Sequence, residues 1–248
     1  MKKISSPSIA RSFFTRDAST KLLAATTLAT LLVACSSTPQ PDWKANTKDA
    51  LDRASAAYLK GDMRTATQEF QFAHAEVART GRADLVARVV LTECAVHIAS
   101  LDINDCVAFN ALRQDASDAE RVYADYLSGQ ISTTAITLLP NQHRKIAAAQ
   151  SDAAANAALK EISDPIAQLV AAGVLLRSHR ASPTTLTIAT ETASAQGWRR
   201  PLLAWLGAQK QLAEQRGDTQ QVQALQRRLQ LIQDPVKSTT MPNNSIIK

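Results

Sequence analysis

Glycine is scarce in this chain, with only seven among 248 residues. No glycine-rich loop that would hold a phosphate group is present, and neither a Gly-x-Ser-x-Gly nor a His-Glu-x-x-His pattern occurs. The four histidines fall on separate predicted helices: His74, His97, His143 and His179. We therefore expect a protein that is not an enzyme and that binds neither a cofactor nor a metal ion.

A long apolar run is also lacking near the N-terminus. The uncharged run from Leu22 to Ala34 has 13 residues, whereas a membrane-spanning helix needs about 20. Basic residues precede the run, and it ends in Leu32-Val33-Ala34-Cys35 before a polar Ser36-Ser37-Thr38-Pro39 spacer. This order of segments is typical of a cleaved signal peptide.

The segment Leu32-Val33-Ala34-Cys35 resembles the lipobox of bacterial lipoproteins. The resemblance implies that residues 1–34 are removed and that Cys35 becomes the lipidated N-terminus. In a Gram-negative source, Ser36 in place of Asp implies the periplasmic face of the outer membrane. The alternative is an ordinary secretory signal with an incidental cysteine.

Removal of residues 1–34 changes the charge of the chain. Five of the 28 Lys and Arg residues and one of the 22 Asp and Glu residues lie there, so the net charge falls from +6 to +2. Residues 35–164 carry −4 and residues 165–248 carry +6. We therefore expect no nucleic-acid partner. The basic half either faces lipid A phosphates, peptidoglycan or an acidic protein, or complements the acidic half within one domain.

Glycine and proline positions predict an all-α fold. Five glycines lie between apolar-periodic stretches, where helices end, and pairs such as Asp164-Pro165 and Ser182-Pro183 are typical helix starts. Sustained period-2 alternation is absent. The predicted helices cover 43–60, 63–80, 83–101, 107–113, 117–128, 141–150, 152–162, 165–178, 183–195, 200–216 and 218–233. We expect a linker at 35–42, a disordered tail at 234–248 and a possible subdivision near 129–139.

The first predicted helix pair carries a regular set of small and aromatic residues: Ala54, Tyr58, Gly61-Asp62, Ala66, Phe70 and Ala73. This spacing resembles the tetratricopeptide repeat (TPR). The resemblance implies antiparallel helix pairs stacked as a right-handed solenoid, with these side chains in the core. It covers one repeat only, because Gly217-Asp218 is followed by Val222 and Gln226 where Ala and Phe are expected. An unrelated helical bundle is the alternative.

Two cysteines remain once Cys35 is assigned to lipidation. Cys94 and Cys106 are separated by the end of a predicted helix and a short turn, and an exported protein enters an oxidising compartment. We therefore expect a disulfide between them, worth roughly 2 to 3 kcal/mol. The alternatives are two buried thiols or, with His97, a metal site that lacks a fourth ligand.

The densest cluster of Trp and Arg lies near the C-terminus. Trp198, Arg199 and Arg200 are candidate partner-binding residues, because Trp and Arg are enriched at interface hot spots. Arg227 and Arg228, together with Arg177 and Arg180, would extend a basic face if the last helices stack in sequence. The alternative places Trp205 in the core and Trp198 at a helix start.

Lytic transglycosylases place their catalytic Glu directly before Ser, and the nearest approach here is Glu161-Ile162-Ser163. An enzyme acting on peptidoglycan is therefore the least favoured hypothesis.

The leading prediction is a non-enzymatic scaffold, anchored in the outer membrane by lipid, that binds an envelope protein in an assembly, piloting or activating role. A structural or peptidoglycan-associated lipoprotein without a dedicated protein partner is the alternative.

Overall fold

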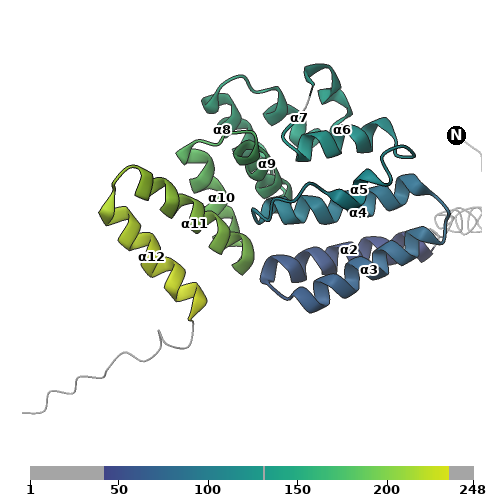
Figure 1. Ribbon diagram of the computed structural model, residues 1–248, viewed down its shortest axis with the longest axis horizontal. Helices are drawn as coiled ribbons and strands as arrows, with labels where there is room; N and C mark the ends of the chain where they lie inside the picture. The colour runs from purple at the N-terminus through teal and green to yellow at the C-terminus, as the bar shows by residue number, and fades with distance from the viewer. Residues whose placement is uncertain (1–41, 131, 235–248) are drawn as a thin grey trace, which may run out of the picture. The chain divides into compact units, whose positions relative to one another are not determined.

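The computed structural model describes residues 42–130 and 132–234, which form helices joined by turns and loops and contain no strand (Figure 1). The helices are α2 (Asp42–Lys60), α3 (Met63–Ala78), α4 (Ala83–Ala99), α5 (Val107–Asn110), α6 (Asp118–Leu127), the 3-10 helix η2 (Thr133–Leu138), α7 (Asn141–Ala148), α8 (Asp152–Glu161), α9 (Pro165–Arg177), α10 (Pro183–Ala195), α11 (Arg199–Gln215) and α12 (Thr219–Gln233). The all-α prediction is confirmed. The predicted signal peptide, Cys35 and residues 235–248 of the predicted tail lie outside the described residues.

Local sequence signals account for the helix boundaries. The side chains of Asp164 and Ser182 accept hydrogen bonds from backbone N–H groups in the first turns of α9 and α10, and proline follows each of them. All five glycines predicted to end helices have positive φ, as at Gly61 with 95°. One prediction is wrong in extent, because the helix expected over 107–113 ends at Asn110.

Helices α2 and α3 form an antiparallel pair around small and aromatic side chains. Tyr58 and Phe70 are at most 4% exposed, and the alanines of the TPR-like pattern lie between the helices at 0 or 1%. Small residues let two helices approach closely, and the aromatic rings fill the space beside the contact. The core role predicted for this pattern is confirmed.

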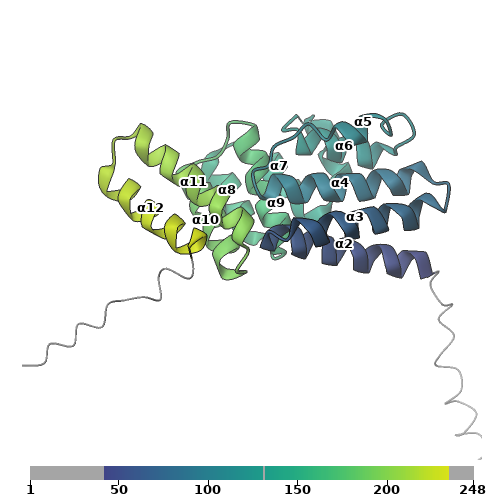
Figure 2. The same cartoon turned by 60° about the horizontal axis from the view of Figure 1, so that its bottom comes forward.

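The helices that follow α3 do not pack only on the helices next to them in the sequence. Helix α9 packs on α4, and α11 returns to contact α2 (Figures 1 and 2). At the α4–α9 crossing a Cβ atom on Gly173 would lie 2.5 Å from the Ile98 carbonyl oxygen, so only glycine permits this approach. The main hydrophobic core includes residues from both sides of the segment 129–139.

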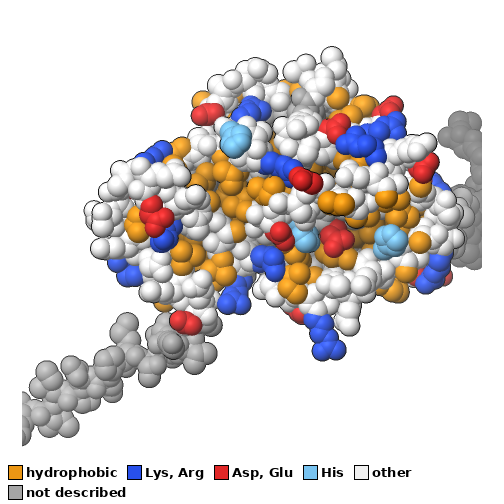
Figure 3. Space-filling view, in the orientation of Figure 1, with side chains coloured by type: hydrophobic (Ala, Val, Ile, Leu, Met, Phe, Trp, Pro, Cys, Tyr) orange, Lys and Arg blue, Asp and Glu red, His pale blue; other side chains and the backbone are white. Residues whose placement is uncertain are grey.

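The described surface mixes residue types. On the face seen in Figure 1, hydrophobic side chains form patches that single acidic and basic side chains interrupt (Figure 3). Among the described helices, none has both the length and the apolar character required to cross a bilayer.

Candidate interaction groove

The predicted Trp and Arg cluster is only partly available at the surface. Trp198 precedes α11 and is half-buried against the core, whereas Arg199 is exposed. Arg200 turns inward: its guanidinium lies 4.4 Å from the centre of the Tyr58 ring, and its Nη1 donates a hydrogen bond of 3.2 Å to the Tyr58 hydroxyl. Arg200 thus joins α11 to α2.

The basic face predicted to extend this cluster is wrong in part. Arg177 donates to the Asn104 carbonyl oxygen and pairs with Asp105, and Arg180 donates to the Ala149 carbonyl oxygen. Both arginines therefore hold the fold together. Arg227 and Arg228 are exposed on α12.

Trp205 belongs to the core, as the alternative interpretation of the cluster predicted. Its side chain is fully buried, and its indole N–H donates to the Ala99 carbonyl oxygen at 3.0 Å. That carbonyl ends α4, where no further helical N–H is available to it. The bond therefore satisfies a helix terminus and ties α11 to α4.

The C-terminal end of α4 is densely cross-linked by a set of contacts that we call the brace. It consists of Tyr58, His97, Asp102 and Arg200, together with the disulfide between Cys94 and Cys106. The Asp102 carboxylate accepts from the Tyr58 hydroxyl at 2.9 Å and lies 3.0 Å from His97 Nδ1. Burial, followed by the hydrogen bond to Asp102, raises the pKa of Tyr58 well above its usual value.

The disulfide holds the segment that follows α4. The Cα atoms of Cys94 and Cys106 are 5.8 Å apart, and both sulfur atoms are used in the bond. Leu101 and Cys106 have positive φ values of 56° and 46°, which are uncommon for residues with side chains. No group of three metal-binding side chains is found in residues 42–130 and 132–234. In the metal alternative, the two thiols of Cys94 and Cys106 would be ligands beside His97, and here the disulfide uses both of them.

The remainder of α4 borders a groove that the sequence did not reveal. A hollow of about 570 Å³ lies between α2, α4 and the first turns of α9. A second hollow of about 650 Å³ adjoins it over the same stretch of α4, between α6 and α7. The two hollows share Arg88, Thr92, Tyr123 and Gln142. We call this continuous depression the α4 groove. Its apolar lining includes Leu51, Leu85, Val89, Val96, Ile166 and Val170.

The floor of the α4 groove carries neutral polar groups. His143 is 1% exposed, and its Nδ1 lies 3.3 Å from the Tyr126 hydroxyl. Burial lowers the pKa of His143 to about 4, so its ring is uncharged at neutral pH. Tyr123 lies beside it, with ring centres 5.9 Å apart, and burial raises the pKa of its hydroxyl. The floor offers hydrogen bonds, but neither ring titrates near pH 7.

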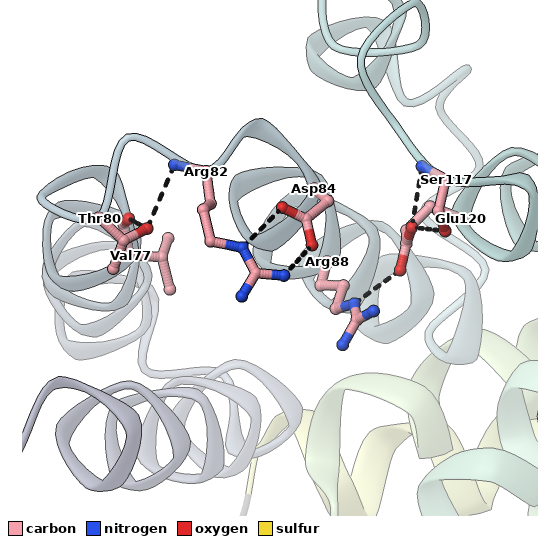
Figure 4. A network of polar contacts seen from close by, with 7 residues as sticks. All are labelled: Val77, Thr80, Arg82, Asp84, Arg88, Ser117 and Glu120. Carbon is pink, nitrogen blue, oxygen red and sulfur yellow. Dashed lines mark hydrogen bonds and ion pairs between the residues drawn. The ribbon is translucent and has the colours of Figure 1, made fainter. Parts of the chain in front are cut away.

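Charged side chains form the rim of the groove. Arg88, which is 60% exposed, pairs through Nε with Glu120 at 2.6 Å, while Glu120 also accepts from Ser117 (Figure 4). Lys48 pairs with Asp52 at 2.6 Å. The Glu120 side chain is 6% exposed, so its charge lies behind Arg88 and the arginine faces solvent. The rim thereby keeps exposed cations beside an apolar lining.

The chain matches no family model, no curated protein and no solved structure.

Proposed function

We propose that this protein is a non-enzymatic scaffold of the bacterial cell envelope that holds a protein partner in the α4 groove. The observation that carries the proposal is the groove itself, which combines two adjoining hollows, an apolar lining and a neutral polar floor. Binding sites are typically apolar depressions with a few well-placed polar groups. Assembly, piloting or activation of an envelope machine are the roles that fit such a scaffold.

The lipobox supports a position at the outer membrane, on its periplasmic face. Seven residues separate Cys35 from Trp43, a reach of about 25 Å when fully extended, so lipid on Cys35 would keep the helical domain close to the bilayer. The TPR-like pattern of the first helix pair supports a role in protein binding, because stacked helices offer extended surfaces to partners.

Site-specific crosslinking in the native envelope tests the proposal. A photoreactive amino acid in place of Gln142, which is exposed and lines both hollows, should give one stoichiometric protein product. The same group at Gln220 on α12 serves as the matched control. Recovery of peptidoglycan without a protein would support the structural or wall-associated alternative, and release of muropeptides by purified protein would establish an enzyme.

The exposed residues of the Trp and Arg cluster make a second candidate contact. Arg199, Arg227 and Arg228 remain in solvent, whereas Arg200 is needed within the fold. Replacing Arg199 with Glu therefore tests this surface without disturbing the brace. Unchanged partner capture by Arg199→Glu would remove the cluster as the main contact and leave the α4 groove.

A further inference from the structure

We propose that the occupant of the α4 groove is an amphipathic helix of the partner, with acidic residues on both sides of its apolar face. This inference rests on the proposed function and specifies the chemistry of the partner. Three properties of the groove support it: the hydrogen bonding of its walls, its length along α4 and the charge of its rim.

The walls of the groove are poor partners for an extended chain. They are helices, whose backbone groups are already bonded within each helix, and the described residues provide no sheet edge. The hydroxyls of Thr47 and Thr92 donate to the carbonyl oxygens of Trp43 and Arg88 in their own helices, at 2.7 and 2.8 Å. An extended peptide would leave its own N–H and C=O groups unpaired there, whereas a helix satisfies them internally.

The length of the groove suits about three helical turns. Leu85 and Val96 both line the first hollow, and they are separated by eleven residues of α4. At 1.5 Å per residue this is about 16 Å, or three turns of a bound helix. Apolar side chains spaced at i, i+3 or i+4, and i+7 would face Leu51, Val89 and Ile166 on the groove lining.

The rim explains why the bound helix should be acidic. Four exposed cations border the two hollows (Lys44, Lys48, Arg88 and Arg144), against two exposed carboxylates (Asp52 and Asp164). Two of the cations are already paired, Lys48 with Asp52 and Arg88 with the buried Glu120. Asp164 accepts the Ala167 N–H at 2.7 Å as the cap of α9. Among the described residues no carboxylate lies within 4 Å of the Lys44 or Arg144 side chain. Glutamate or aspartate beside the apolar face of a ligand would complement these cations.

Three synthetic peptides test the inference on the full lipidated protein in detergent. The first is an 18-residue helix with leucines on one face and glutamates beside them; the second has lysines in place of the glutamates; the third is the acidic peptide with two central prolines. By fluorescence anisotropy we expect the acidic helix to bind at least about tenfold more tightly than either control peptide. Equal or tighter binding of the lysine peptide would overturn the acidic assignment. Equal binding of the proline peptide would overturn the helical one.

Two matched variants test whether the acidic peptide binds in the α4 groove. Lys44→Glu changes a rim cation, and Lys160→Glu makes the same charge change at an exposed position of α8 that does not line either hollow. We expect Lys44→Glu to weaken binding of the acidic helix about fivefold, with Lys160→Glu close to wild type. Equal losses in both variants would mean a long-range charge effect and contradict the site.

The failure of this inference can be told apart from the failure of the proposed function. A protein crosslinked at Gln142, combined with no preference for the acidic helix, would retain the scaffold and reject the acidic helical occupant. No protein crosslinked at Gln142 would reject the groove as the scaffold's binding site, whatever the synthetic peptides do.

Discussion

The two ends of α4 are built in contrasting ways. At the C-terminal end, the brace connects α2, α4 and α11 through the Asp102 carboxylate and the stacked guanidinium of Arg200, and the disulfide ties the segment after α4 back to this helix. Toward the N-terminal end, Thr92 bonds within α4 and Arg88 makes an ion pair to Glu120 on α6, and both side chains line a groove. One end of α4 therefore fixes the positions of the neighbouring helices, and the other end leaves a surface free for the proposed partner.

The largest expected effect is at the braced end. Trp205→Ala removes a fully buried side chain and leaves the Ala99 carbonyl oxygen without its indole donor, so we expect a loss of about 3 to 5 kcal/mol in the free energy of unfolding. Urea unfolding followed by circular dichroism measures it. Trp198→Ala, at a half-buried position, is the control and should cost clearly less. Similar losses in the two variants would contradict the assignment of Trp205 as the anchor.

The stability of the protein should depend on pH through His143, which lies in the floor of the α4 groove. Its folded-state pKa of about 4 lies below the value of about 6.5 in an unfolded chain, so between these values the unfolded state binds more protons. Stability should therefore fall by about 3 kcal/mol as the pH drops from 6.5 to 4, and should not change from this source above pH 7. Unfolding curves of the wild type and His143→Gln isolate the effect. Parallel pH profiles would show that His143 protonates freely in the folded protein.

The disulfide should contribute an intermediate amount. Cys94 and Cys106 are 12 residues apart, and for a closed loop of this size we expect a loss of about 2 to 3 kcal/mol when both are replaced by serine. Thermal unfolding of the double variant with and without reductant provides the measurement. Reductant should lower the midpoint of the wild type toward that of the variant, and leave the variant unchanged.

A smaller effect is expected for the contact between α11 and α2. Arg200→Met keeps the aliphatic length but removes the guanidinium above the Tyr58 ring and its hydrogen bond, which should cost about 1 kcal/mol. Arg199→Met at the neighbouring exposed position should stay within about 0.5 kcal/mol of wild type. Equal stabilities for the two variants would mean that the brace does not depend on Arg200.

The smallest effect on stability is expected at the groove rim. Lys44→Glu alters an exposed side chain and should change the free energy of unfolding by less than about 0.5 kcal/mol. The substitution should change binding alone. This result would distinguish the groove end of α4, which serves binding, from the braced end, which serves stability. A large loss of stability would show that the rim supports the fold.

Local signals explain which features could be predicted from the sequence. The starts of α9 and α10 follow from Asp164-Pro165 and Ser182-Pro183, because a cap and a proline act within one helical turn. The core position of Tyr58 was expected from the TPR-like spacing, and that of Trp205 as the alternative to a contact site; both side chains are buried.

Contacts between distant residues could not be predicted in this way. Arg200 meets Tyr58, which lies 142 residues earlier, and this contact withdraws one arginine from the predicted partner-binding cluster. The α4 groove depends on which helix faces stay uncovered after α9 has packed on α4, a property of the packing that no short stretch of sequence contains. Its local trace is the pair Arg88 and Thr92, which lie four residues apart and therefore on one side of α4.

The close crossing of α4 and α9 at Gly173 also constrains the order in which the protein can fold. Ile98 and Gly173 are 75 residues apart, so during synthesis the apolar side of α4 stays uncovered until α9 has been made. Contacts of such long sequence separation form late, because a large loop must close before they can contribute. The helix pair α2–α3 can assemble early from neighbouring residues, but the groove takes shape only when the second half of the chain arrives.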